Sequence, residues 1–121
     1  GVTPVTYVSP NATHTVGDAS FDAAISIDAL QEMTAAQVAG YFALFQRIVR
    51  PGGLILTLNR RRWLAEERFD NNPLCYPYAP QNRVVRWEVD RFMAATANAG
   101  GAHRDPWYLR IEQVRTLEDK R

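Results

Sequence analysis

Polar side chains that could handle a proton or an anion gather in two short stretches of the sequence. One stretch holds Asp28, Gln31 and Glu32, and the other is the run Asn59-Arg60-Arg61-Arg62-Trp63. A carboxylate can act as a general base toward a hydroxyl group, and an arginine can bind a phosphate or an anionic sugar through two parallel hydrogen bonds. The two stretches therefore predict a site for a small molecule with a hydroxyl or an anionic group.

Each of these features also has a structural interpretation. Glu32 can stabilise the N-terminus of a helix that opens at Thr34, and we place this above a catalytic role for Glu32. Asp28 can simply end a strand, but here we favour function slightly. A solvated surface explains the arginine run equally well. The rings that follow predict either a platform for a sugar or a loop pinned to the core; they are Trp63, Phe69, Tyr76, Tyr78 and Trp87, with Pro77 among them.

Hydrophobic patterns identify the elements that must position these residues. Two nearly continuous apolar runs, at residues 21–27 and 54–59, are typical of strands buried on both faces of a parallel sheet. Between them, Thr34 and Gln37 form a capping-box pattern, and apolar side chains then recur at helical spacing as far as Pro51-Gly52-Gly53, which should end the helix.

Weaker patterns complete the prediction. They indicate strands at residues 5–8 and 107–117, a loop over 60–81 with one helical turn near 64–68, and a helix over 87–99. This alternation of strands and helices is the signature of an α/β domain. Ligands of open α/β sheets bind beyond the carboxyl ends of the strands, where this chain offers residues 9–11, 28–33 and 59–62.

The segment from Phe21 to Met33 resembles the fourth strand and following loop of class I S-adenosylmethionine-dependent methyltransferases. The Tyr41-Phe42 pair, the turn Pro51-Gly52-Gly53 and the strand that ends at Asn59 resemble the next helix, turn and fifth strand. Within that family, the Asp28-x-x-Gln31-Glu32-Met33 loop is most similar to sugar O-methyltransferases. The match is good over residues 21–59 and weak on both flanks.

The resemblance implies an α/β fold: the C-terminal half of a Rossmann-like methyltransferase sheet, mostly parallel with an antiparallel final strand pair. The family's strand order is 3-2-1-4-5-7-6, with residues 5–8 as strand three and 107–117 in the final pair. The N-terminal half with its glycine-rich cofactor loop has no counterpart, since no Gly-x-Gly occurs. We therefore expect residues 1–121 to be one partial domain, a fragment of a longer protein.

Removal of strands one and two would leave an apolar, unpaired edge on strand four, which is an aggregation hazard. We expect the missing N-terminal half, or a second chain, to complete the sheet. The chain alone should then be inactive, and it should not be a stable, cooperative monomer.

The resemblance also implies S-adenosylmethionine as cofactor and a small-molecule acceptor such as a sugar. For three residues to which the resemblance gives a cofactor contact, a plain alternative exists: Asn11 could form an ordinary Asx turn, and Ile27 and Leu30 need no role beyond the core. The residues implied are Asp28 and Glu32 for catalysis; Asn11, Ile27, Asp28 and Leu30 for the cofactor; and Gln31, Asn59, Arg60, Arg62 and Trp63 for the acceptor.

Composition limits the class of protein. Apolar residues make up 46% of the 121 residues, charged residues 22%, and the net charge is +1, as in a soluble globular domain with no general attraction to nucleic acid or membrane. The single cysteine, Cys75, excludes an intramolecular disulfide and suits a reducing compartment, so we expect a cytoplasmic protein. His14 and His103 lack ligand spacing, and we expect no metal site.

Two functions remain open at this point. The first is an S-adenosylmethionine-dependent O-methyltransferase, and the second is a non-catalytic, truncated or degenerate Rossmann-like module that associates with a partner chain. The order of the motifs disfavours a nucleotide-binding or dinucleotide-binding protein of another kind.

Overall fold

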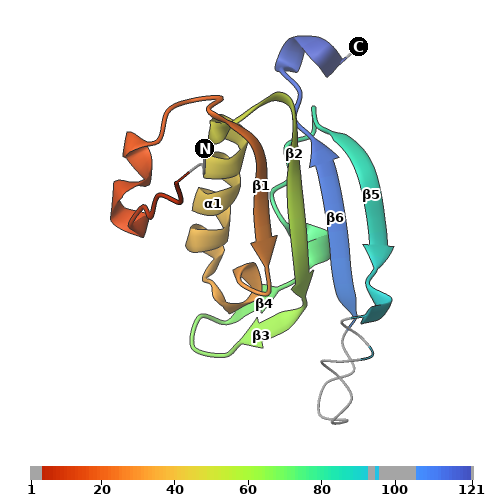
Figure 1. The fold of residues 1–121 in the computed structure, drawn as a ribbon. Helices are drawn as coiled ribbons and strands as arrows, with labels where there is room; N and C mark the ends of the chain where they lie inside the picture. Colours follow the sequence, from red (N-terminus) through yellow and green to blue (C-terminus); the bar gives the residue numbers. More distant parts are fainter. Residues whose placement is uncertain (1–3, 93–94, 96–105, 121) are drawn as a thin grey trace.

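The computed structural model describes residues 4–92, 95 and 106–120, which form a four-stranded mixed sheet with a long helix beside it (Figure 1). The strand order is β1-β2-β6-β5. β1 (Phe21–Ile27) is parallel to β2 (Val49–Arg60), whereas β6 (Trp107–Gln113) is antiparallel to both β2 and β5 (Arg83–Val89). β1, β2 and β5 therefore run in one direction and share a carboxyl edge.

This order and these directions are the ones that the resemblance implies for strands four, five, seven and six. β1 pairs with β2 along one side only, and no strand of the described residues pairs with its other side. The described part of the sheet thus ends at β1.

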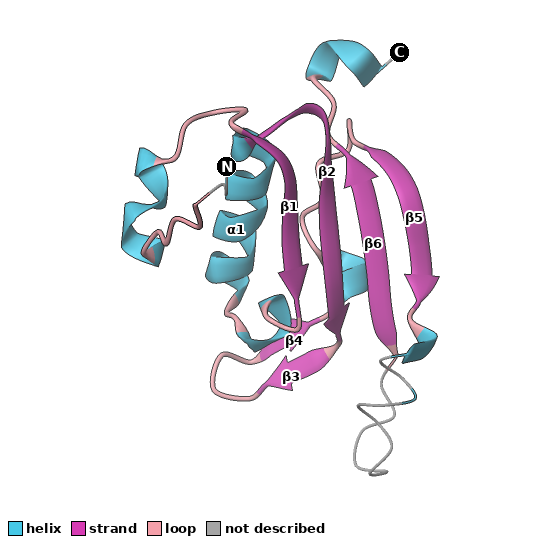
Figure 2. Cartoon of the chain, viewed as in Figure 1, coloured by secondary structure: helices cyan, strands magenta, loops and turns pink. Residues whose placement is uncertain are grey.

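One long helix and several shorter elements surround the sheet, and Figure 2 colours them by type of secondary structure. A small hairpin lies below the carboxyl edge in Figure 1. No helix among residues 4–92, 95 and 106–120 is long and apolar enough to cross a membrane. The elements are the helix α1 (Ala35–Ile48); the hairpin strands β3 (Arg62–Leu64) and β4 (Phe69–Asn71); and the 3₁₀ helices η1 (Pro10–Thr15), η2 (Leu30–Glu32), η3 (Pro73–Cys75) and η4 (Leu117–Lys120).

The predicted capping box opens α1. The Thr34 hydroxyl accepts a hydrogen bond from the backbone N–H of Gln37 at 3.2 Å, and the Gln37 side-chain oxygen accepts one from the backbone N–H of Thr34 at 3.0 Å. The predicted apolar stripe follows, with Val38 and Phe42 buried. The helix therefore begins where the sequence predicts.

The two faces of the sheet are covered unequally. Ala24 and Ile55 are register partners that pack with side chains of α1. Because side chains alternate along a strand, Ile25, Ile27 and Leu54 belong to the opposite face, and they are 65%, 54% and 41% exposed. The prediction that β1 is buried on both faces is therefore wrong, since its second face stays open in the described structure.

Two further predictions are wrong. Residues 5–8 form no strand, and Val5 and Tyr7 are 99% and 89% exposed because no neighbouring strand pairs with them. Residues 87–89 belong to β5 and not to a helix; the helix expected there covers residues 91 and 92, and most of its remainder lies outside the described residues. Alternating polar and β-branched or aromatic residues in Arg83–Val89 could have revealed this strand.

Three boundaries also differ. α1 ends at Ile48, and Pro51-Gly52-Gly53 lies within β2, where Gly52 has a φ of +84°. The expected loop contains the β3–β4 hairpin, so the helical turn near 64–68 is a hairpin turn. The last strand ends at Gln113, four residues earlier than predicted.

Close backbone packing at Gly53 yields a stability prediction. A Cβ there would lie 2.6 Å from the Asp22 carbonyl oxygen and 2.9 Å from that of Arg50, whereas a Cβ at Gly40, inside α1, meets nothing within 4 Å. Gly53→Ala should lower the free energy of unfolding by about 1–3 kcal/mol. Gly40→Ala should raise it by about 0.5–1 kcal/mol. Urea denaturation of both variants measures the two changes, and equal signs would contradict the packing at Gly53.

Candidate active site

A sharp turn at the end of β1 presents Asp28 at the carboxyl edge. Asp28 has a φ of +56°, a left-handed conformation that aspartate tolerates better than most residues. Its backbone N–H still donates to the Leu58 carbonyl at 2.8 Å, so the residue remains attached to β2. The side chain is exposed. The turn thus places a carboxylate in solvent at a fixed point of the sheet.

Gln31 connects this turn to the next strand. Its side-chain nitrogen donates to Asp28 Oδ1 at 2.6 Å, and its oxygen accepts from the backbone N–H of Arg60 at 3.0 Å. Only 1% of the residue is exposed. Gln31 was predicted to bind the acceptor. In the structure it is buried, and both polar atoms of its side-chain amide form hydrogen bonds with the protein.

Asn71 and Tyr76 hold η2 in place, and the sequence analysis gave Asn71 no role. The Asn71 amide donates to the carbonyl oxygens of Leu30 and Met33, both at 2.9 Å, and its oxygen accepts from the Tyr76 hydroxyl. Asn71 is fully buried. No local motif marks it, because its partners lie about forty positions earlier in the chain.

The arginine run is divided between different partners. Arg62 forms an ion pair with Glu32, and Arg61 donates to both oxygens of Asp70 at 2.8 and 2.7 Å. The Arg61 hydrogen bonds lower the pKa of the Asp70 carboxyl below its usual value. Glu32 thus forms an ion pair with an arginine side chain. The hydrogen bonds that cap α1 come from Thr34 and Gln37, and the interaction of Glu32 with the N-terminus of the helix stays a prediction.

Arg60 differs from its two neighbours. It lies opposite Trp107 in the sheet, with the guanidinium carbon 5.8 Å from the Trp107 ring centre. Its Nε and the Trp107 indole nitrogen are buried and have no hydrogen-bond partner among the residues that the structure describes.

The other predicted residues lie in varied surroundings. Asn59 is 1% exposed, and both polar atoms of its side chain lack a partner in the described part of the chain, whereas Trp63 is 59% exposed in the hairpin. Leu30 belongs to a core cluster with Val38, Phe42 and Tyr76, and so has the plain core position considered for it. Ile27 is half exposed beside Asp28.

Asn11 does not join the group at the carboxyl edge. It lies in η1, where its backbone N–H donates to Ser9, and Figure 1 draws η1 beside α1 at some distance from the hairpin. Arg47, in the last turn of α1, anchors this region by donating to the carbonyls of Val16 at 2.6 Å and Thr13 at 3.0 Å. The structure thus brings together Asp28, Gln31, Glu32, Arg60 and Arg62, without Asn11.

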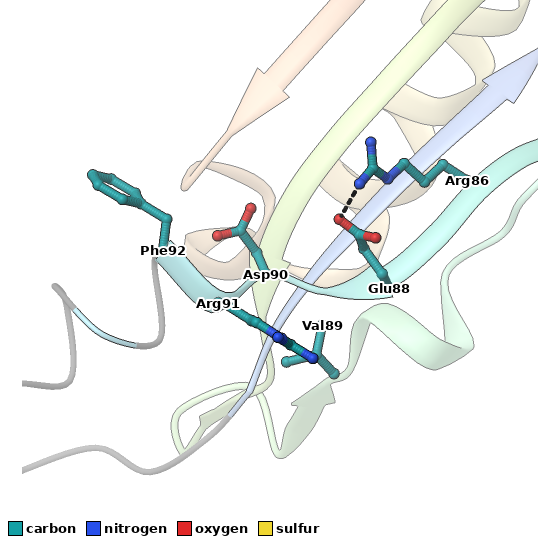
Figure 3. Close-up of a pocket in the computed structure, with 6 residues that line it drawn as sticks. All are labelled: Arg86, Glu88, Val89, Asp90, Arg91 and Phe92. Atoms are coloured by element: carbon teal, nitrogen blue, oxygen red, sulfur yellow. Dashed lines mark ion pairs between the residues drawn. The ribbon is translucent and has the colours of Figure 1, made fainter.

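A cavity of about 580 Å³ lies where β5 ends, lined by none of the predicted residues (Figure 3). Arg86 and Glu88 form an ion pair of 3.0 Å within it. Among residues 4–92, 95 and 106–120, no three His, Cys, Asp or Glu side chains are grouped to hold a metal ion. The lining residues are Arg86, Glu88, Val89, Asp90, Arg91 and Phe92.

Comparisons with solved structures identify the fold. The PH0226 protein from Pyrococcus horikoshii OT3 superposes on 82% of this chain with a TM-score of 0.53 and 14% identity. The [4+2]-cyclase SpnF does so over 82% with a TM-score of 0.51 and 15% identity. The mixed α/β sheet of this chain partly matches these two methyltransferase-fold structures. It spans about half of each structure, 54% and 51% respectively.

This likeness extends to the fold alone. No protein-family model matches the sequence, and none of the curated proteins compared is similar to it. One of these two structures is a cyclase, and a fold by itself does not fix an activity. The chemistry must therefore be argued from the residues at the carboxyl edge.

One buried and one partly buried tyrosine give a pH prediction. Burial raises the pKa of both Tyr76 and Tyr78 well above the usual value near 10, with Arg110 opposing the effect at Tyr78. In the unfolded chain these phenols ionise near pH 10, whereas the folded state keeps their protons. The free energy of unfolding should therefore be constant with respect to these groups below about pH 10 and fall as the pH rises beyond it.

Urea denaturation between about pH 8 and pH 11 measures this loss. Tyr76→Phe and Tyr78→Phe should each flatten the decline, and Tyr76→Phe should also lower stability near neutral pH by about 1 kcal/mol, because the bond to Asn71 is lost. Tyr7→Phe is the control, since Tyr7 is 89% exposed. An unchanged decline in both buried variants would contradict the assignment.

Proposed function

We propose that this chain is the catalytic-edge half of an S-adenosylmethionine-dependent O-methyltransferase that acts on a sugar or another small molecule with a hydroxyl group. The observation that carries the proposal is the position of Asp28, an exposed carboxylate fixed in a left-handed turn at the carboxyl end of β1. A methyltransferase fold supports it, because ligands of open α/β sheets bind at this edge.

The residues present suit one wall of the cofactor site. Ile27 offers exposed apolar surface directly before the Asp28 carboxylate, and Leu30 supports the loop from the core. S-adenosylmethionine supplies, when bound, an electrophilic methyl group. The sequence contains no Gly-x-Gly, and we propose that a loop outside residues 1–121 holds the rest of the cofactor. For Asn11 we propose contact with the cofactor only after η1 has moved.

Methyl transfer to a hydroxyl group requires that the acceptor oxygen lose its proton. Asp28 accepts this proton and orients the hydroxyl, because its carboxylate has one oxygen free of hydrogen bonds to the described residues. Glu32 is the second candidate, but its ion pair with Arg62 opposes a role as base. Arg60, Arg62 and Trp63 line the acceptor side, with the cation of Arg60 suited to an anionic sugar. Asn59, near the end of β2, is the remaining residue for which we propose contact with the acceptor.

Asp28→Asn is the direct test. Asparagine also tolerates the left-handed conformation and can still accept from Gln31, so the free energy of unfolding should change little. Methyl transfer should fall by about 100-fold or more, as for loss of a general base. The measurement is transfer of labelled methyl from S-adenosylmethionine by the natural gene product that contains this chain.

Glu32→Gln is the matched control and should retain most of the activity. Calorimetric titration with S-adenosylhomocysteine completes the test, with tight binding expected for the complete gene product and not for residues 1–121 alone. Normal turnover by Asp28→Asn would show that the site is misassigned.

The second candidate function is a non-catalytic module that docks with a partner. The unpaired side of β1 and the exposed Ile25, Ile27 and Leu54 beside it favour this candidate, because such an edge readily adds another strand. We propose as occupant the other half of the sheet, an N-terminal half with a strand parallel to β1. The lone Cys75 suits the cytoplasmic location that we propose for either function.

A charge on the open face tests the docking. Ile25→Lys should reduce self-association of the isolated chain in sedimentation velocity and change the free energy of unfolding by less than about 0.5 kcal/mol, since Ile25 is 65% exposed. Leu117→Lys is the control, because Leu117 is 73% exposed but lies in η4, outside the sheet. A stable monomer of the unmodified chain would contradict docking, and a discrete dimer would identify a second copy as the occupant.

A further inference from the structure

We propose that Gln31 is a positioning residue that holds Asp28 Oδ1 against the protein and leaves Oδ2 as the atom that receives the acceptor's proton. The inference rests on the proposed function, because it takes Asp28 as the base. It assigns Gln31 a different part from direct acceptor binding.

The orientation of the Gln31 amide follows from its partners. The backbone N–H of Arg60 can only donate, so the Gln31 atom 3.0 Å from it must be the oxygen. The nitrogen must then face Asp28, which accepts at Oδ1 at 2.6 Å. A flipped amide would place N–H against N–H and oxygen against carboxylate. The direction of both bonds is therefore fixed.

Burial makes these bonds effective. Gln31 is 1% exposed, so water has little access to compete for its amide. Its flanking residues are held as well, because Asn71 donates to the carbonyl oxygens of Leu30 and Met33 on either side. The side chain thus extends from a fixed backbone and cannot follow a displaced carboxylate.

Asp28 is constrained from a second direction. Its backbone N–H donates to the Leu58 carbonyl at 2.8 Å, which ties the residue to β2. Gln31 reaches the same strand through Arg60. Both contacts use the carboxyl end of β2 as their support, so the carboxylate has a defined place relative to any acceptor held beside Arg60. Asp28 is an exposed residue, and its Oδ2 accepts no hydrogen bond from the described residues.

A positioning role makes a specific kinetic prediction. A displaced base stabilises the transition state less while substrate binding is unaffected, so kcat falls and KM does not change. Gln31→Glu keeps the side-chain volume and the hydrogen bond from the backbone N–H of Arg60. It replaces the amide nitrogen that faces Asp28 Oδ1 with an oxygen, so that two carboxylates lie against each other and repel. Small displacements of catalytic groups cost about 10- to 100-fold in rate.

The experiment compares Gln31→Glu with Gln46→Glu in the complete gene product. Gln46 is partly buried and, like Gln31, forms two side-chain hydrogen bonds, in its case with Asn82 at 3.1 and 2.8 Å. Gln31→Glu should lower kcat by about tenfold or more with KM changed by less than about twofold. Gln46→Glu should leave both within about twofold. Unchanged kcat in Gln31→Glu, or a loss carried by KM, overturns the proposal.

A measurement on Gln31 itself needs neither turnover nor a folded Gln31 variant. The side-chain amide signal of Gln31 in ¹H–¹⁵N spectra should move clearly in Asp28→Asn, whereas the Gln46 amide signal should not. An unmoved Gln31 signal overturns the proposal even if Gln31→Glu does not fold. If the Gln31 signal moves but Asp28→Asn turns over normally, the hydrogen bond between Gln31 and Asp28 stands. That result would nevertheless refute both the proposed function and the positioning role of Gln31.

Discussion

Backbone hydrogen bonds between β1 and β2 place the residues of the candidate site next to one another. Their parallel register places Ile27 beside Leu58, so the chain leaves β1 next to the end of β2. Asp28 can then bond to Leu58, and Gln31 can bond to Arg60. Without this register the carboxylate and the arginine run, thirty positions apart in the sequence, would have no reason to meet. Everything proposed about chemistry at the carboxyl edge depends on this pairing.

The same pairing leaves the molecule asymmetric. β2 is bonded on both sides, by β1 and β6. Among the described residues β1 has a strand partner on one side only, and its second face exposes Ile25 and Ile27. A protein rarely leaves such an edge uncovered. The catalytic and the docking candidates therefore do not exclude each other, since a completed sheet would both cover the apolar face and supply a further wall for the cofactor site that we propose.

Local patterns predicted the local structure well. Thr34 and Gln37 specify a helix start by hydrogen bonds within four residues, and the run ending at Ile27 has the composition of a strand. Burial of β1 could not be predicted in the same way, because it depends on what packs against the strand. The strand predicted at residues 5–8 is absent for a related reason, since a strand forms only where a neighbouring strand hydrogen-bonds to it.

The site was predictable in outline but not in its pairings. The rule that ligands bind at the carboxyl ends of strands grouped Asp28 with Arg60. It could not reveal that Glu32 pairs with Arg62, nor that Asn71 and Tyr76 support η2, because these contacts join distant parts of the chain.

A crystal structure of the complete gene product with S-adenosylhomocysteine and an acceptor sugar would test the central claim most directly. The account predicts the acceptor hydroxyl within hydrogen-bond distance of Asp28 Oδ2; ligands bound in the cavity at the end of β5, away from Asp28, would contradict it.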